Sequence, residues 1–119
     1  MELLLNILLG LIAALHLWFL VLEMFLWRKP IGLKTFRMSQ EKADSSAVLA
    51  ANQGLYNGFL AAGLIWGMCP VGSAFYIRLF FLTCVAIAGI FGAATVSRRI
   101  FYIQAMPALI ALAVLFLNK

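Results

Sequence analysis

Residues 51–58 (ANQGLYNG) place three carboxamides and a phenol within an otherwise apolar stretch that is typical of a membrane-spanning helix. Carboxamides and phenols both donate and accept hydrogen bonds. Lipid offers no hydrogen bonds, so these groups must be satisfied by protein, water or a ligand. Recognition of a ligand by hydrogen bonding is therefore the first chemistry that the sequence indicates.

Glu23 and His16 could add acid–base chemistry to these amides. They are seven residues apart, about two helical turns, so they share one stripe of a helix. A carboxyl group inside hydrocarbon is unfavourable unless it is paired, hydrated or protonated, and such groups often anchor ligands or transfer protons. The structural alternative for both residues is hydrogen bonding that holds helices together.

The composition defines the class of protein that carries these residues. Of 119 residues, 66% are hydrophobic and 11% are charged, and the mean hydropathy is +1.06. Soluble domains are nearer half apolar and a quarter charged. We expect one integral membrane domain over residues 1–119.

Four apolar stretches approach or exceed the ~20 residues that cross a bilayer. They are residues 3–27, 47–68, 75–96 and 100–117. The first lacks the positive amino-terminal region and cleavage site of a signal peptide, so it is interpreted as a helix. Short turns at 69–73 and 97–99 make neighbours antiparallel, which predicts an all-α, up-down four-helix transmembrane bundle.

The net charge of +5 follows membrane topology rather than a nucleic-acid surface. Five cations occupy the loop 28–46: Arg28, Lys29, Lys34, Arg37 and Lys42. Arg98 and Arg99 lie in the turn between the last two spans. The positive-inside rule places both segments in the cytoplasm and both termini outside. Arg78 is expected to snorkel to the outer interface.

Local signals mark the ends of the helices. Pro30 should break the first helix, and Asp44, Ser45 and Ser46 are predicted caps for the second. Residues 40–46 could form a short surface helix. Pro107 is predicted to kink the fourth span.

The two cysteines and the single histidine are too widely spaced for a disulfide framework or a metal site. We therefore expect no metal site, and the sequence leaves the identity of any cofactor unknown.

The predicted topology gives a depth to each polar residue. Glu23 and Gln104 lie about 6 Å from the inner boundary, and His16 about 16 Å, at ~1.5 Å per residue. The polar residues of the second span lie about 8–15 Å in. Together they form a polar layer in the cytoplasmic half. The candidate ligand-binding residues are Glu23, Asn52, Gln53, Tyr56, Asn57, His16 and Gln104.

The second span also carries small residues at every fourth position, namely Ala50, Gly54, Gly58 and Ala62. Such ladders let helix backbones approach closely. Gly89, Gly92 and Ala93 predict a similar contact for the third span. The amides on the adjoining arc could line a cavity or hold helices together; three of them with a tyrosine favour a cavity.

Residues 22–27 (LEMFLW) and 49–64 (LAANQGLYNGFLAAGL) resemble the small bacterial membrane proteins known as domain-of-unknown-function family 1304. The resemblance covers essentially the whole chain, and the second stretch is long and specific. It implies a bacterial inner-membrane protein and brings no established activity.

A more distant similarity is to the membrane-associated eicosanoid and glutathione metabolism proteins. These are four-helix proteins that form trimers and bind glutathione between subunits, and Asn52 would match the Asn of their second helix. Their pattern has an Arg before this Asn and a Glu after it, where this chain has Val48 and Leu55. That departure argues against thiol-transfer chemistry.

Three functions remain open from the sequence. The first is a membrane enzyme or binding protein for a small amphipathic ligand that enters from the cytoplasmic side. The second is a small oligomeric transporter, which the nearly apolar outer half disfavours. The third is a structural or partner-binding subunit with the amides as glue. In each case the lipid bilayer is a partner, nucleic acid is not, and the thin bundle predicts a homo-oligomer.

Overall fold

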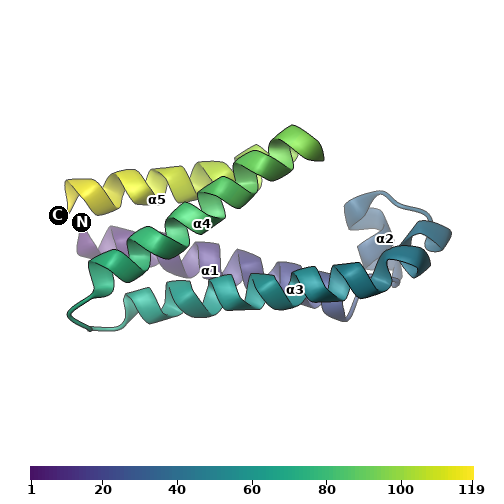
Figure 1. The fold of residues 1–119 in the computed structure, drawn as a ribbon, viewed down its shortest axis with the longest axis horizontal. Coiled ribbons are helices and arrows are strands. Elements are labelled where there is room, and N and C mark those ends of the chain that lie inside the picture. Colours follow the sequence, from purple (N-terminus) through teal and green to yellow (C-terminus); the bar gives the residue numbers. More distant parts are fainter. The chain divides into compact units, whose positions relative to one another are not determined.

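The computed structural model describes all 119 residues, and every regular element in it is helical. The prediction of an all-α protein is therefore confirmed. In chain order the helices are α1 (Glu2–Met24), α2 (Pro30–Phe36), α3 (Gln40–Met68), α4 (Ala74–Thr95), the π-helix η1 (Phe101–Ala105) and α5 (Met106–Leu117) (Figure 1).

The chain divides into two compact units, and each is described by itself. The terminal unit contains residues Met1–Ala13 and Leu60–Lys119, and the central unit contains Ala14–Phe59. Helices α1 and α3 each contribute residues to both units. Helices α1 and α4 are long and apolar enough to cross a membrane, whereas the continuous stretch Phe101–Leu117 is apolar but shorter.

The terminal unit has one hydrophobic core to which four helices contribute. Leu5 and Leu9 of α1 and Leu64 of α3 are fully buried in it. Leu82 and Val85 of α4 pack in the same cluster. Alanines of α5 complete it, namely Ala108 and Ala111. Side chains this small bring helix axes close together, as expected where packing rather than water drives association.

Glycines on α4 permit its contact with the η1 segment. A Cβ atom at Gly89 would lie 2.5 Å from the backbone nitrogen of Ala105, which is too close for any side chain. One turn later, a Cβ at Gly92 would lie 3.0 Å from the Ile100 side chain. The predicted close packing of the third span at Gly89 and Gly92 is therefore confirmed.

Arg78 of α4 is buried, with 7% of its surface exposed, so the prediction that it snorkels outward is wrong. Its Nε donates to the Gly67 carbonyl at 2.6 Å, and its Nη2 pairs with Glu2 Oε1 at 2.7 Å. Asn118 donates a further hydrogen bond to Glu2 Oε2 at 2.9 Å. Because these partners satisfy the guanidinium, it has no need to reach water. The cluster ties both chain ends to the α3–α4 corner.

Helix α3 starts at a different residue from the one that the sequence predicts. The helix begins at Gln40, and residues 40–46 continue directly into the apolar stretch. The Lys42 backbone N–H donates to Ser39 Oγ at 3.1 Å, which makes Ser39 the cap. The predicted caps at Asp44, Ser45 and Ser46 are wrong, because these residues lie inside the helix.

Helix α1 ends at Met24, before Pro30, so the prediction that Pro30 breaks the first helix is wrong, and Pro30 begins the next helix instead. Lys29, which precedes it, is extended, and Pro30 starts α2 at a position where the missing N–H costs nothing. Gly32 of α2 is buried against the backbone carbonyls of Leu26 and Trp27, where a Cβ would collide. The loop between the first two predicted spans therefore contains a short helix folded back over the end of α1.

The disturbance predicted at Pro107 takes the form of a π turn. The Met106 N–H donates to the Phe101 carbonyl, five residues back, and α5 then starts with Pro107 in its first turn. A proline cannot supply the N–H that an uninterrupted α-helix requires at its position. The wider π turn absorbs this loss, and it contains Gln104.

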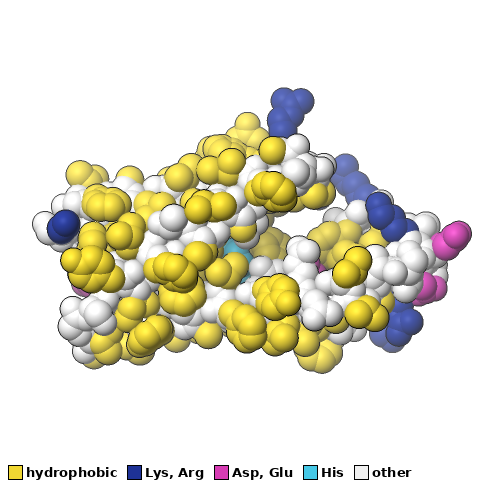
Figure 2. Space-filling model, in the orientation of Figure 1, with side chains coloured by type: hydrophobic (Ala, Val, Ile, Leu, Met, Phe, Trp, Pro, Cys, Tyr) yellow, Lys and Arg dark blue, Asp and Glu magenta, His cyan; other side chains and the backbone are white.

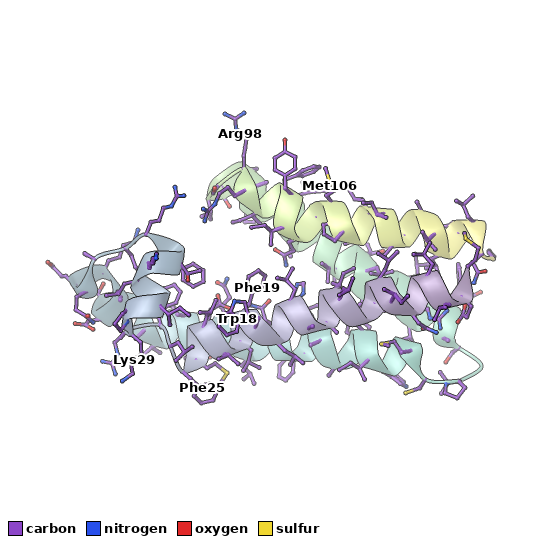
Figure 3. The ribbon with its side chains drawn as sticks, turned by 180° about the vertical axis from the view of Figure 1, so that it is seen from behind. Trp18, Phe19, Phe25, Lys29, Arg98 and Met106 are labelled. Atoms are coloured by element: carbon purple, nitrogen blue, oxygen red, sulfur yellow. The ribbon has the colours of Figure 1, made fainter.

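Replacing Arg78 by Gln should destabilise the terminal unit by about 2 kcal/mol, because charged hydrogen bonds to Glu2 and Gly67 are lost. Arg98→Gln is the matched control, since Arg98 is exposed and projects from the turn before η1 (Figure 3). Chemical unfolding in detergent, followed by circular dichroism, measures both. Equal unfolding midpoints for the two variants would contradict the role assigned to Arg78.

Candidate functional site

Helices α1 and α3 pack closely within the central unit because α3 has glycines at the contact. A Cβ at Gly54 would lie 2.7 Å from Met24 Cγ and 3.1 Å from Glu23 Cβ. A Cβ at Gly58 would lie 2.8 Å from Leu20 Cδ1. The predicted small-residue contact of the second span is thus confirmed at both glycines, and its partner is α1.

The close approach brings Asn57 of α3 to Glu23 of α1. Asn57 Nδ2 donates to Glu23 Oε1 at 2.6 Å, and Glu23 is only 5% exposed. No lysine or arginine forms an ion pair with this carboxyl group, and no donor in the chain reaches Oε2. Every fully buried side-chain oxygen or nitrogen has a partner, so Oε2 retains contact with open space. Glu23 therefore has one free acceptor.

A hollow of about 350 Å³ opens beside Glu23, at the end of α1. Its charged and amide lining comes from Glu23, Arg28, Lys29, Gln40 and Asp44. Its apolar lining comes from Met24, Phe25, Trp27 and Ala47. Figure 3 labels Phe25 and Lys29, which flank the end of α1 where the chain turns toward α2. The hollow combines charges of both signs with an apolar wall.

Hydrogen bonds between the end of α1 and the start of α3 fix the walls of this hollow. Gln40 Nε2 donates to Asp44 Oδ1 at 2.9 Å and to the Arg28 carbonyl at 3.4 Å. Trp27 Nε1 donates to Ser46 Oγ at 3.1 Å. The indole is therefore held by a directed bond as well as by packing.

Charged side chains gather around this end of the central unit, at α2 and the first turns of α3 (Figure 2). The exposed cations there are Arg28, Lys29, Lys34, Arg37 and Lys42. None of them forms an ion pair within the chain. Cations therefore outnumber carboxyl groups around the hollow, whose lining includes the carboxyl groups of Glu23 and Asp44.

Three of the predicted ligand-binding residues lie away from Glu23. Asn52 is exposed, and its Nδ2 donates to the Val48 carbonyl of its own helix at 2.9 Å. Gln53 is exposed, and Tyr56 is 58% exposed. The arc assigned to one cavity is therefore split: Asn57 meets Glu23, and the other three side chains do not line the hollow.

The remaining two candidates lie in different environments. His16 is fully buried on α1, and its ring packs edge-on against Phe19 at 5.8 Å. Gln104 is half-buried in the π turn of the terminal unit. The structure brings no group of three His, Cys, Asp or Glu side chains together in a way that could hold a metal ion.

Sequence reasoning overlooked most of the lining of the hollow. From the sequence, Arg28 and Lys29 indicate only membrane topology, and Asp44 indicates only a helix cap. The spacing of Gln40 and Asp44, one helical turn apart and just before the amide segment, is a signal that could have paired these two lining residues.

The fold and the site together define an all-α protein with two helices able to span a membrane and a polar hollow at the end of the first. The chain belongs to the family described as "Protein of unknown function (DUF1304)", whose model matches residues 10–116. This confirms the resemblance inferred from the sequence.

A curated relative with a similar sequence is the "Uncharacterized protein YpaA" of Lactococcus lactis subsp. lactis (strain IL1403). It is 30% identical over 111 residues, which cover 91% of this chain and 93% of that protein. No solved structure matches the chain. The distant similarity to the eicosanoid and glutathione metabolism proteins therefore gains no support.

Replacing Gly54 by Val should separate α1 from α3 and destabilise the fold by about 1–3 kcal/mol, the usual range for overpacking. Gly72→Val is the matched control, because nothing lies within 4 Å of a Cβ at Gly72. Thermal unfolding in detergent measures stability, and hydrogen exchange of Asn57 and its neighbours reports the contact. Equal stabilities for the two variants would contradict the packing described.

Proposed function

We propose that this protein is a multi-pass membrane protein of the bacterial inner membrane that binds a small amphipathic ligand in the hollow beside Glu23. The helices α1, α3, α4 and the continuous η1–α5 segment are the four spans of one domain. The basic residues around α2 face the cytoplasm, both termini face outward, and the ligand enters from the cytoplasmic side.

The surface of the long helices supports the membrane assignment. In the most apolar stretches of α1 and α4, only 28% and 33% of the residues are buried within the protein. The core helix of a soluble protein would be mostly buried. Exposed large apolar side chains instead run along both helices. Figure 2 shows hydrophobic side chains over much of one face of the molecule. Contact with lipid explains why these side chains need no protein cover.

The single observation that carries the ligand proposal is the half-satisfied carboxyl of Glu23. Its Oε1 accepts a hydrogen bond from Asn57, while Oε2 has no donor within the chain. Only 5% of the surface of Glu23 is exposed. Because Oε2 opens onto space outside the chain, it is available to accept a hydrogen bond from a ligand. A ligand with an ammonium or hydroxyl group would satisfy it.

The lining of the hollow indicates the class of ligand. Arg28 and Lys29 suit an anionic group such as a phosphate, while Glu23 and Asp44 suit a cation. The indole of Trp27 and the Met24 side chain suit an apolar chain. A zwitterionic head on an apolar tail meets all three requirements, so the ligand class proposed is a small zwitterionic amphiphile.

The topology is tested with single cysteines in a Cys69→Ser, Cys84→Ser background. Lys34→Cys, on α2, should react with a membrane-impermeant maleimide only after the cells are broken. Ser73→Cys, in the turn between α3 and α4, should react in intact cells. Both positions are exposed in the folded chain, so burial does not separate them. Labelling of Lys34→Cys in intact cells would overturn the proposed orientation.

Ligand binding is tested by quenching of Trp27, which lines the hollow. In a Trp18→Phe, Trp66→Phe background it is the only tryptophan. The probe is a lysophosphatidylethanolamine with a brominated acyl chain, added to the protein in maltoside micelles. Saturable quenching is expected. Glu23→Gln should weaken it about tenfold or more, because a hydrogen bond to a charged group contributes about 1.5–3 kcal/mol.

Glu41→Gln provides the matched control for this titration. Glu41 is an exposed carboxylate in the first turn of α3, outside the lining of the hollow, and its loss changes the net charge by the same amount. Its binding curve should follow that of the parent protein. Equal weakening in the Glu23 and Glu41 variants, or quenching without saturation, would refute the proposed site.

A further inference from the structure

Three cations lie on and around α2 in the central unit, outside the lining of the hollow. They are Lys34 of α2, Arg37 at the end of that helix, and Lys42 near the start of α3. All three side chains are exposed, and none forms an ion pair. These three residues are called the basic cluster.

The chain has too few acidic side chains to neutralise this segment. Its four carboxyl side chains are Glu2, Glu23, Glu41 and Asp44. Glu2 is paired with Arg78, and Glu23 is buried. The two that remain can pair with at most two of the five cations in residues 28–42, and the rest of the chain adds only further cations. Because this count depends on composition alone, at least three cations of the segment need a negative partner from outside the chain.

Helix α2 holds the basic cluster at the end of α1. A Cβ at Gly32 would collide with the backbone carbonyls of Leu26 and Trp27, so α2 packs directly on the residues that follow α1. The rings of Trp27 and Phe36 lie 4.8 Å apart between centroids. With α1 as a membrane span, this places the cluster at the level of the lipid headgroups, where tryptophan is enriched. That placement rests on the membrane location given under the proposed function, and not on the ligand.

Arg37 ends α2 in a backbone conformation that favours glycine. Its φ is 52° and its ψ is 53°, in the left-handed region, and its N–H donates to the Leu33 carbonyl. No other residue besides glycine has a positive φ in this chain. Glycine is the usual residue at such a helix end, because a side chain there is unfavourable. An arginine in this position supports a use for its charged side chain.

We propose that the basic cluster binds the phosphate headgroups of anionic phospholipids in the leaflet around the end of α1. Ammonium and guanidinium groups both donate hydrogen bonds to phosphate oxygens. Each cation beside an anionic membrane surface increases affinity about fivefold. Ile31 and Phe36 of α2 are also exposed, and they suit the apolar layer beneath the headgroups. A soluble acidic partner would explain the cations but not these apolar side chains at the end of a span.

The lipid contact is tested by native mass spectrometry of the whole chain in maltoside micelles. The probes are a phosphatidylglycerol and a phosphatidylcholine with the same acyl chains, so only the headgroup differs. The parent protein should bind the phosphatidylglycerol at least tenfold more tightly. Lys34→Gln, Arg37→Gly and Lys42→Gln, combined in one variant, should lower this preference at least fivefold. Glycine suits the left-handed backbone at position 37, so the variant keeps the end of α2.

A matched control variant removes the same amount of positive charge outside the basic cluster. Gly72→Asp, Ser73→Asp and Lys119→Gln together lower the net charge by about three, as side-chain ionisation at pH 7 dictates. The control should keep the headgroup preference within twofold of the parent, because the basic cluster is unaltered. Circular dichroism and elution volume check that both variants are folded. Equal binding of the two lipids by the parent, or the same loss of preference in both variants, would overturn the proposal.

Failure of the lipid contact and failure of the ligand hypothesis are distinguishable. The basic-cluster variant leaves the lining of the hollow intact, so quenching of Trp27 by the brominated ligand should follow that of the parent. Glu23→Gln should keep the preference for phosphatidylglycerol. Normal quenching without a headgroup preference would reject the lipid contact alone. A normal headgroup preference without saturable quenching would support the lipid contact and reject the hollow as a ligand site.

Discussion

The close approach of α1 and α3 at Gly54 is the constraint on which the candidate site depends. With any larger residue there, the side chains of Met24 and Glu23 would meet a Cβ at 2.7 and 3.1 Å. Asn57 reaches the Glu23 carboxyl only because the two backbones are this near. The hollow follows from the same contact, since α1 ends beside the first turns of α3. A steric property of one glycine thus determines where a buried carboxyl group is placed.

The two buried charged side chains, Arg78 and Glu23, differ in how fully their polar atoms are hydrogen-bonded within the chain. Arg78 is saturated by the Glu2 carboxylate and the Gly67 carbonyl, which is the pattern of a structural tie between chain ends. Glu23 has one amide partner and no counter-ion. A fully hydrogen-bonded polar group stabilises the fold. A partly hydrogen-bonded one lowers the stability of the fold and is typical of positions that have a function. The contrast agrees with a structural role for Arg78 and with the ligand-binding role that we propose for Glu23.

The sequence predicted the long helices and the packing glycines well, because both depend on local composition. Apolar length defined α1 and α4, and the four-residue spacing identified Gly54 and Gly58. It failed at the start of α3, where the good capping residues Asp44 to Ser46 suggested a boundary. Ser39 caps the helix instead, because residues 40–46 pack and hydrogen-bond against the end of α1. Such a tertiary preference overrides local propensity and leaves no trace in periodicity.

The division of the amides between two sides of α3 also lay beyond the sequence. Their angular positions on the helix place Asn52, Gln53 and Asn57 on one arc of α3. The location of α1 decides which end of that arc packs against another helix. Asn57 is the member nearest α1, and it alone pairs with Glu23. If these residues were only glue, a glutamine at position 23 would serve better than a glutamate, because an amide could bond to Asn57 without placing a carboxyl group among apolar neighbours. The presence of an acid with a free oxygen beside an open hollow therefore favours recognition over adhesion.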